Sequence, residues 1–348
     1  MGLDIGTSGV RAAELSLGKH GATLERFGQV ALPPGAVRDG EVMDPDAVAE
    51  AIKHLWRSVK FGSKKVVLGV ANQKVVVRQV DLPWLPLSEL KQSLAYQVQD
   101  FIPMPVENAI LDFHAVEELE VDGRRMLRVL LVAAARDMVT TLLEAVTKAG
   151  LTATQVDLTP FAVLRSLATV DNFGAMADAE ALVEVGSKVT NIVVHQNGTP
   201  RFVRVLLMGG DNVTEAVAER MGVPFDEAAG IKHQGSLGSV PGVATSEHPA
   251  DRVIESSGHL FVEEVRGSLD YYLAQAGSVP LRRIVVSGGG ARLGGLAQRL
   301  ALATRLPVDP ASPLSSLKVG KTGLSDEQLT FVEPLVTVPV GLAMGVAS

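Results

Sequence analysis

The sequence predicts an α/β protein with two related halves and a small α+β module inserted into the first half. Three observations predict this class. A strand–turn–strand unit with glycine in its turn occurs at 2–15 and again at 182–194. A third glycine turn, Ser287–Gly290, separates a short apolar run from an amphipathic segment. The residue pattern of 74–136 differs from that of both halves, which indicates an insertion.

The composition is that of a globular protein large enough for two domains. The chain has 348 residues and 36.7 kDa, with 47% hydrophobic and 20% charged residues. A net charge of −7 disfavours nonspecific nucleic-acid binding, and 4% aromatic residues argue against a stacking surface for RNA or carbohydrate. The absence of cysteine excludes disulfides and thiolate zinc sites. The first strand begins at once and no apolar stretch reaches the roughly 20 residues of a membrane helix, so we expect a cytoplasmic protein without a signal peptide.

The first half begins with a predicted strand meander over 1–17 and 22–32. Asp44 is expected to cap a helix that has Pro45 at its first position. The helix has an apolar face at helical spacing, formed by Val48, Ile52, Leu55, Trp56 and Val59. Residues 65–71 follow as a nearly continuous apolar run, which is typical of a central strand in a covered sheet.

The inserted module is predicted to have the order strand, helix, strand, strand. We expect strands at Val75–Leu82, Ala109–Glu117 and Met126–Ala135 and a helix at Ser88–Phe101. The helix would turn Leu90, Leu94 and Val98 inward. After the module, Asp137 is expected to cap a helix that buries Val139, Leu142, Leu143 and Val146 and ends at Gly150.

The second half is predicted to start near Ala181 and to include a mainly helical region, Asp211–Ala276. Within it, His233–Ser257 is rich in Gly, Ser and Pro and predicts a loop. Arg283–Val286 predicts a strand, and the helix after the glycine turn would bury Leu293, Leu296 and Leu300. The apolar tail Leu335–Ala347 contains Pro339 and is too short to span a membrane, so it predicts a buried final helix.

The two glycine hairpins predict a phosphate site. Backbone N–H groups in such turns point outward and can cradle a phosphate, and hydroxyl side chains add donors. Asp4 lies two residues before Gly6 and Glu184 two residues before Gly186, so each acid can hold a divalent ion or a water beside the phosphate. The N-terminus of the helix behind the third glycine turn is a further site for an anion or a purine. Two distant hairpins therefore indicate a duplicated fold that holds one polyphosphate from both sides.

These three elements, in this order, resemble the actin, hexokinase and heat-shock chaperone superfamily. The sequence is most similar to one branch, the PilM proteins of type IV pilus assembly, which are related to the division protein FtsA. The segments that carry this resemblance are the first hairpin, Tyr96–Pro105, Ala109–Phe113, Ser268–Tyr272 and Ser287–Ala291. The resemblance covers nearly the whole chain. It implies an actin-like, ribonuclease-H-like duplicated fold of two domains with an inserted small α+β subdomain.

The resemblance also implies a site for ATP or ADP with Mg²⁺ between the two domains. The first hairpin would take the terminal phosphates, the second the opposite side of the phosphate chain, and the third glycine turn the adenosine. Asp4 and Glu184 would be the metal-binding and catalytic acids. The implied nucleotide-binding residues are Asp4, Gly6, Thr7, Ser8, Gly9, Arg11, Gly186, Ser187, Lys188, Thr190, Asn191, Gly209, Gly210, Lys232, Gly288, Gly289, Gly290 and Arg292. Asp211 and Asn212 are expected to cap the helix that follows Gly210.

The chain departs from the family pattern at several of these positions. Arg11 replaces the usual Lys, and Glu184 replaces the usual Asp. Thr159 stands where relatives often have a Glu that orients the attacking water, and here it predicts a helix N-cap instead. Ala229 replaces an acid that accepts the ribose hydroxyls. Because phosphoryl transfer depends on positioning and metal electrostatics, we expect nucleotide binding with slow or absent hydrolysis.

The implied partner is the N-terminal cytoplasmic peptide of a PilN-like inner-membrane protein, besides other pilus assembly proteins. The protein would act as a scaffold peripheral to the inner face of the membrane. The resemblance implies subdomain 1A at 1–73 and 137–175 with a C-terminal helix at 336–348, and an SHS2-like subdomain 1C at 74–136. Subdomain 2A would comprise 176–210 and 277–335, and subdomain 2B would comprise 211–276.

Two alternatives stay open from the sequence. The first is an enzyme, either an active actin-like ATPase or a small-molecule kinase, although a kinase would need an Asp general base facing a substrate cleft. The second is an FtsA-like filament-forming anchor. An anchor is expected to carry a C-terminal amphipathic helix, and we expect no such helix from the final residues 345–348.

Overall fold

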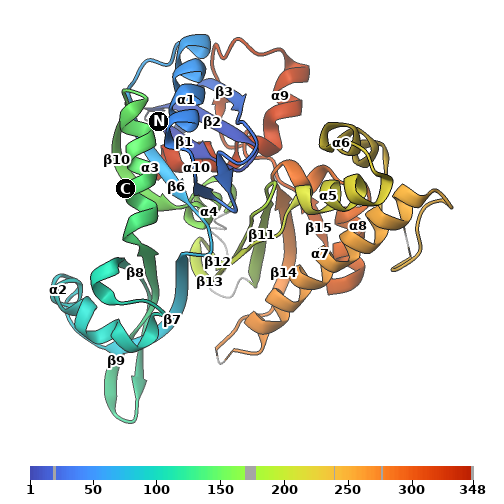
Figure 1. Ribbon diagram of the computed structural model, residues 1–348. Coiled ribbons are helices and arrows are strands. Elements are labelled where there is room, and N and C mark those ends of the chain that lie inside the picture. Colours follow the sequence, from blue (N-terminus) through green and yellow to red (C-terminus); the bar gives the residue numbers. More distant parts are fainter. Residues whose placement is uncertain (19–20, 169–177, 239, 276, 346–348) are drawn as a thin grey trace.

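The computed structural model describes residues 1–18, 21–168, 178–238, 240–275 and 277–345. The predicted boundaries at residues 175 and 276, and residues 346–348 of the predicted final helix, lie outside this part of the chain. Figure 1 shows two α/β halves side by side, with a small module projecting from the first half.

A six-stranded sheet forms the core of the first half. Its order is β10 (Thr152–Leu158), β6 (Lys65–Val70), β1 (Gly2–Ile5), β2 (Gly9–Gly18), β3 (Gly21–Ala31) and β16 (Lys318–Val319). Strands β1, β2 and β3 form an antiparallel meander, as predicted, and β6 and β10 continue the sheet parallel to β1. A short ribbon of β4 (Val37–Arg38) and β5 (Glu41–Val42) follows the meander.

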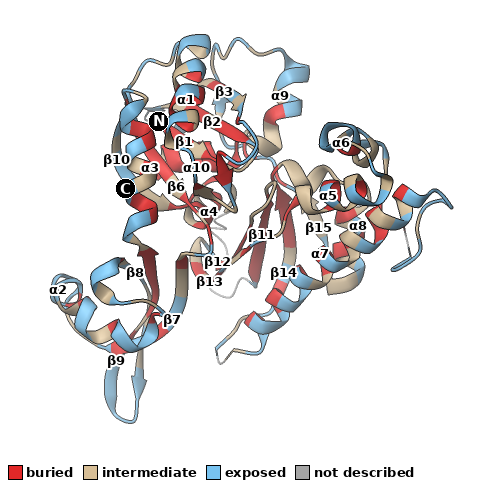
Figure 2. Cartoon of the chain, viewed as in Figure 1, coloured by how far each residue is buried: buried red, intermediate tan, exposed pale blue. Residues whose placement is uncertain are grey.

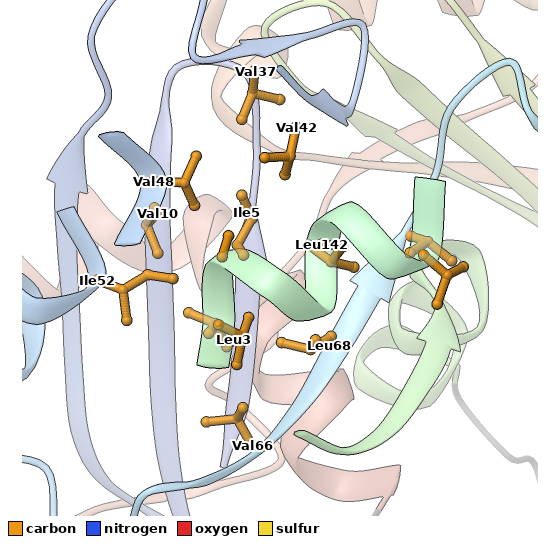
Figure 3. Packing of buried hydrophobic residues seen from close by; sticks show 14 of the residues in the cluster. Leu3, Ile5, Val10, Val37, Val42, Val48, Ile52, Val66, Leu68 and Leu142 are labelled. Atoms are coloured by element: carbon orange, nitrogen blue, oxygen red, sulfur yellow. The ribbon is translucent and has the colours of Figure 1, made fainter. Parts of the chain in front are cut away.

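Helices cover both faces of this sheet. On one face, α1 (Pro45–Val59) and α3 (Arg136–Lys148) pack against residues of the sheet. Figure 3 shows Val48 and Ile52 of α1 and Leu142 of α3 beside Leu3 and Ile5 of β1. On the other face lie α4 (Thr159–Leu167) and α10 (Thr337–Met344). Because side chains alternate along a strand, Gly2 and Asp4 of β1 point to this second face.

Glycines allow α10 to approach its neighbours closely. A Cβ atom at Gly2 would lie 1.9 Å from the carbonyl oxygen of Pro339, and one at Gly341 would lie 1.8 Å from that of Ala162. The backbones of β1, α4 and α10 are therefore in direct contact. The predicted buried final helix is confirmed, and Pro339 lies in its first turn, where the missing N–H costs little.

A five-stranded sheet forms the core of the second half and repeats the first. Its order is β13 (Thr199–Leu206), β12 (Thr190–Gln196), β11 (Ala179–Val185), β14 (Leu281–Ser287) and β15 (Val308–Pro310). Strands β11, β12 and β13 form an antiparallel meander, and β14 and β15 extend it in parallel. The strand order β3-β2-β1-β6-β10 of the first half has the same directions, which confirms the predicted duplication.

The faces of the second sheet have different partners. Ala181, Val183 and Val185 of β11 pack against the helices of this half. These helices are α5 (Gly210–Met221), α6 (Phe225–Gln234), α7 (Pro249–Leu273) and α8 (Leu296–Thr304). On the opposite face, Leu182 joins Val163 of α4 in a cluster between the halves. Figure 2 shows β11 and β14 as largely buried strands.

The inserted module contains the predicted elements. It comprises β7 (Val75–Pro83), α2 (Leu87–Val98), β8 (Ala109–Val121) and β9 (Arg124–Ala135), with short 3-10 turns η1 (Gln99–Phe101) and η2 (Val106–Asn108). The antiparallel sheet has the order β7-β9-β8, and α2 buries Leu90, Leu94 and Val98 against it. An ion pair between Glu117 of β8 and Arg201 of β13, 3.1 Å apart, joins the module to the second half.

Several predicted boundaries differ from the structure. The loop predicted at His233–Ser257 is shorter, because α6 continues to Gln234 and α7 begins at Pro249. His248 caps α7 by accepting the Ala250 N–H at 3.2 Å, so the part of the predicted loop from Pro249 onward belongs to this capped helix. Helix α3 begins at Arg136, and Asp137 lies in its first turn instead of at the N-cap. Helix α4 begins at Thr159 itself and has no side-chain cap, so the predicted N-cap was wrong by one residue.

The segment before the final helix returns to the first half earlier than predicted. The prediction assigned 277–335 to the second half, but β16 pairs with β3 of the first sheet. Leu314, Leu317 and Leu324 also pack against Leu24 and Phe27 of β3. Helix α9 (Asp326–Val332) and the 3-10 turn η4 (Glu333–Leu335) then lead into α10. Across the described ranges, the structure contains no helix long and apolar enough to cross a bilayer.

Candidate functional site

The carboxyl ends of β1, β11 and β14 meet around one cavity between the two halves. The turn after β1 is closed by a hydrogen bond from the Gly6 N–H to the Gly9 carbonyl at 3.0 Å. The turn after β11 has the same closure, from the Gly186 N–H to the Val189 carbonyl at 2.9 Å. Both turns and the glycine corner after β14, residues 288–290, line a cavity of about 280 Å³.

Most of the residues proposed from the sequence line this cavity. They are Asp4, Gly6, Thr7, Ser8, Arg11, Glu184, Gly186, Ser187, Lys188, Asn191, Gly210, Lys232, Gly288, Gly289, Gly290 and Arg292. Gly9, Thr190 and Gly209 are not among the lining residues. Gly9 closes the first turn, and the buried Thr190 donates its hydroxyl to the Met208 carbonyl at 2.7 Å.

Asp4 and Glu184 face the gap between the halves because of strand alternation. Asp4 lies on the same face of β1 as Gly2, which touches α10, and Glu184 lies on the same face of β11 as Leu182, which touches α4. The two acids come from equivalent strands, so the duplicated fold brings them together. The side chain of Asp4 is 17% exposed, and Glu184 as a whole residue is 9% exposed.

Burial makes both acids harder to ionise. It raises the pKa of Asp4, although the nearby positive charge of Arg11, 3.6 Å away, acts in the opposite direction. Burial also raises the pKa of Glu184 to about 7, against the amide of Asn191, which donates to its carboxylate at 2.8 Å. The negative charge of Asp4 contributes to this rise. The pair therefore resists carrying two negative charges unless a cation offsets them.

The glycine corner after β14 requires residues without side chains. Gly288 has φ of +86°, in the left-handed region that favours glycine. A Cβ atom there would lie 2.4 Å from the Val185 carbonyl and 2.7 Å from the Glu184 carboxylate. A Cβ atom at Gly290 would lie 2.5 Å from the Val185 side chain. The corner thus packs its backbone directly onto the end of β11 and leaves the cavity open beside it.

The start of α5 is bound to the second hairpin. The Gly210 N–H donates to the Gly186 carbonyl at 2.9 Å, and the Asp211 N–H donates to the Ser187 carbonyl at 2.8 Å. Gly209 permits this approach, since its Cβ would lie 2.4 Å from the Gly186 carbonyl. These N–H groups are therefore occupied and support the hairpin. The N-cap of α5 is Gly209 rather than the predicted Asp211 or Asn212, and Asn212, in the first turn, accepts the Gly209 N–H at 2.9 Å.

Four cationic side chains reach the cavity from different elements. Arg11 lies on β2, Lys188 on the second turn, Lys232 on α6 and Arg292 on the 3-10 turn η3 (Gly289–Arg292). Lys188 pairs with Glu215, and Lys232 donates to the Gly210 carbonyl at 3.0 Å. Burial lowers the pKa of Lys232, and burial with the charge of Arg11 lowers that of Arg292. An anion in the cavity would offset these costs.

Two buried polar atoms at the site have no hydrogen-bond partner. They are the side-chain oxygen of Asn191 and Nε of Arg11. Buried polar groups in proteins are usually satisfied, so such atoms indicate a ligand or water position. Thr159 also lines the cavity and carries only a hydroxyl there.

Sequence reasoning missed several lining residues. Gly40, Gly69 and Ala71 approach from the first half, and Asp211 and His233 from the second. Gly69 offered a signal, since a glycine within the apolar run 65–71 indicates close approach. Its Cβ would lie 2.7 Å from the Thr159 hydroxyl. Asp211 was interpreted only as a capping residue; it lines the cavity, and burial raises its pKa.

The site has the parts needed to bind a polyphosphate. It combines two N–H-rich turns, four cations and a glycine corner without side chains. No cluster of three or more His, Asp or Glu side chains suited to a metal occurs in the described ranges. Asp4 and Glu184 would still suit Mg²⁺, which is commonly held by one or two carboxylates together with substrate phosphates.

Comparison with known sequences gives a family match over nearly the entire chain. The family model described as type IV pilus assembly protein PilM matches residues 2–346. The cell division protein FtsA of Neisseria meningitidis is 25% identical over 98% of this chain and 88% of that protein. FtsA of Bacillus subtilis is 26% identical over 67% of this chain, and the match spans 57% of its length.

Solved structures show the same fold. The chain is similar to a structure described as the PilM–PilN type IV pilus biogenesis complex, with a TM-score of 0.86 and 27% identity. That match covers 100% of this chain and 98% of the other. MreB5 of Spiroplasma citri bound to ADP has a TM-score of 0.53 at 11% identity, covering 100% and 98% of the two chains. The predicted actin-like two-domain fold is confirmed.

Proposed function

The chain belongs to the family of type IV pilus assembly protein PilM, and from this premise we propose that it is a nucleotide-binding scaffold. It would bind ATP or ADP with Mg²⁺ in the interdomain cavity and dock the N-terminal cytoplasmic peptide of a PilN-like inner-membrane protein. Through this partner and other pilus assembly proteins, it would act at the inner face of the membrane. One observation carries the nucleotide assignment: both glycine hairpins and the triglycine corner line the same cavity.

We propose the following contacts for the parts of the ligand. Gly6, Thr7, Ser8 and Arg11 would hold the terminal phosphates from the first half. Gly186, Ser187 and Lys188 would hold the phosphate chain from the second half. Asn191 would support this side through its unpartnered side-chain oxygen, which can accept a water of the metal shell. Gly288–Gly290, Lys232 and Arg292 would bound the nucleoside. Gly9, Thr190 and Gly209 would act by shaping the turns.

The chemistry of the site supports slow hydrolysis. When bound, Mg²⁺ would neutralise phosphate charge beside Asp4 and Glu184. An attacking water also needs a group that orients it and receives its proton. In the family pattern this group is at the position of Thr159, which lines the cavity here. Its hydroxyl is a poor proton acceptor near neutral pH.

The nucleotide assignment predicts binding with little turnover. Purified protein should bind Mg-ATP in calorimetry and release phosphate far more slowly than about 1 per second, near the low end of ordinary enzyme turnover. A turnover at or above that rate would favour the active-ATPase alternative. Absence of binding to both ATP and ADP would overturn the assignment.

A pair of glycine variants provides the control for this measurement. Gly290→Ala should weaken ATP binding by about tenfold or more, equal to about 1.4 kcal/mol, since the new methyl would press on Val185 and displace the corner. Gly267→Ala, in α7, should leave binding unchanged, since its Cβ would meet nothing within 4 Å.

The partner assignment predicts that the inserted module contributes to peptide docking. The module exposes Tyr96 on α2 at 81%, at the start of the segment Tyr96–Pro105, which is one of the segments that resemble the PilM family. A peptide from the N-terminus of a PilN-like protein should be retained by the protein in a pull-down. Tyr96→Ala should weaken retention by about tenfold, because exposed tyrosines often carry binding energy.

Tyr271→Ala provides the matched control for peptide docking. Tyr271 lies on α7 of the second half and is 59% exposed. Its replacement should leave peptide retention unchanged. Equal losses from both variants, or no retention by the unmodified protein with or without nucleotide, would contradict the proposed docking.

We also propose a subdomain division that follows the sheets. Residues 1–73 and 137–175 would form subdomain 1A, together with the returning segment from about 314 to the end of the chain. Residues 74–136 would form the SHS2-like subdomain 1C, 176–210 with 277–313 subdomain 2A, and 211–276 subdomain 2B. The pairing of β16 with β3 supports the revised end of 2A.

A further inference from the structure

A buried ion pair links two helices behind the cavity. Arg299 of α8 lies 2.6 Å from Glu255 of α7, and their side chains are only 2% and 3% exposed. Among the described residues, Arg299 is one of the largest side chains that are fully buried. Burying two charges in an otherwise apolar cluster is costly, so the pair needs further partners.

The further partners all lie in the chain segment that follows α6. Glu255 accepts the N–H groups of Gly238 at 2.9 Å and Gly242 at 2.7 Å. Arg299 donates to the carbonyls of Gly238 and Val240, both at 3.1 Å. The ion pair therefore binds this segment to α8, the helix that follows the triglycine corner.

The same segment also contacts the turn between η3 and α8, at residues 294–295. The Leu237 N–H donates to the Gly294 carbonyl at 2.8 Å. Glycine is needed for this contact, because a Cβ at Gly294 would lie 2.8 Å from the Ser236 hydroxyl. One at Gly295, where φ is +75°, would lie 2.6 Å from the Leu237 carbonyl. The two segments are thus in direct contact at residues 236–237 and 294–295.

Beyond this contact, each segment forms one wall of the cavity. Lys232 and His233, at the end of α6, lie on one wall, and Gly290 and Arg292, in η3, lie on the other. Following the two segments away from the cavity residues, they are joined first by the contact of 236–237 with 294–295 and then by the Glu255–Arg299 ion pair. A change in the distance between α8 and the segment after α6 would therefore move the two walls relative to each other.

We propose that Glu255 and Arg299 are positioning residues that fix the separation of these two walls, and so set the affinity for the nucleoside part of a nucleotide. The proposal rests on the proposed nucleotide function and adds residues that do not touch the ligand. The hairpins that would hold the phosphates belong to other elements, β1–β2 and β11–β12. Among the described residues, the side chains of Glu255 and Arg299 hydrogen-bond to each other and to the segment after α6, not to these hairpins. Loss of the pair should therefore affect nucleoside binding selectively.

The test compares ATP with inorganic tripolyphosphate, which has the same phosphates and no nucleoside. Binding of both, with Mg²⁺, is measured by calorimetry on the full chain and on Arg299→Met, Arg299→Lys and Glu255→Gln. We expect the Kd for ATP to rise by about tenfold or more in Arg299→Met, while that for tripolyphosphate changes by less than about twofold. Arg299→Lys keeps the charge and should recover part of the ATP affinity.

Arg283→Met controls for general loosening of the second half. Arg283 lies on β14, pairs with Glu180 at 2.8 Å and Asp309 at 3.3 Å, and does not line the cavity. This variant should keep the ratio of ATP to tripolyphosphate affinity. The proposal is wrong if the Arg299 and Glu255 variants keep that ratio, or if Arg283→Met changes it equally.

Failure of the proposed function would give a different result. In that case the unmodified protein would bind neither ATP nor tripolyphosphate. If Arg299→Met does not fold, Arg299→Lys and Glu255→Gln carry the test, because both keep polar groups at the pair.

Discussion

Arg299→Met is expected to lower the free energy of unfolding of the second half by about 3–5 kcal/mol, the usual cost of leaving one charge of a buried pair alone. Glu255 would then lose its 2.6 Å partner while remaining 3% exposed. The carbonyls of Gly238 and Val240 would also lose a donor. Methionine fills much of the space of arginine, so the loss should come mainly from the unpaired charge and the freed carbonyls rather than from a cavity.

Hydrogen exchange is the suitable measurement for this variant. The two tryptophans, Trp56 and Trp84, lie in α1 and just after β7, so fluorescence would report the first half and the module. Slowly exchanging amides of α7 near Val262 and Val265, which are fully buried, should report the second half. An exchange free energy within about 1 kcal/mol of the unmodified protein would contradict the prediction.

The same helix offers a matched control. Arg266 of α7 pairs with Glu263 on the surface, where both side chains are more than one third exposed. Arg266→Met should change stability by less than about 1 kcal/mol, since exposed pairs contribute little. The double variant Arg299→Met with Glu255→Gln should recover part of the loss, because glutamine is neutral and its oxygen can still accept from Gly238.

The two hairpins and the inserted module could be predicted from the sequence because each depends on local residue patterns. Each hairpin is marked by an acid and a glycine at fixed spacing, and alternation along β1 and β11 turns both acids to the same gap. The module was recognisable from its strand–helix–strand–strand order, which the structure confirms. The site residues that line the cavity mostly come from these patterns.

The features missed from the sequence depend on contacts between distant segments. Nothing near Lys318 indicates that it pairs with Thr23 of β3. The predicted loop His233–Ser257 is too long because its Gly, Ser and Pro content hid the start of α7 at Pro249. Gly258 of α7 is needed for a contact with a distant segment, since its Cβ would lie 2.3 Å from the side chain of Leu237. Glu255 and Arg299 are 44 residues apart and show no motif. Such pairs become visible only when the fold brings them together.

The raised pKa values of the two cavity acids also depend on contacts between distant segments, since the residues next to each acid in the sequence do not predict them. Asp4 and Glu184 belong to different halves, and each is buried by the packing of the two halves against each other. Because burial favours the neutral form, folding should take up a proton at Glu184 between its ordinary pKa of 4.5 and about 7. The free energy of unfolding then depends on pH in that window.

The sign follows from proton uptake by the folded state. Below pH 4.5 Glu184 is protonated in both states and contributes no pH dependence. Between pH 4.5 and about 7 the unfolded chain ionises first, so stability should fall as the pH rises, by about 3 kcal/mol in total. Above pH 7 this contribution should be constant. The raised pKa of Asp4 acts in the same direction.

Glu184→Gln should remove this part of the pH dependence, because glutamine stays neutral while its side chain can still bond to Asn191. Urea unfolding of both proteins at pH 5, 6, 7 and 8 should show that the difference between them grows in favour of the variant up to about pH 7. Parallel curves over this range would contradict the prediction.

Adding Mg-ATP at pH 8 should stabilise the unmodified protein more than Glu184→Gln, since a bound cation would replace the proton as the partner of the paired carboxylates.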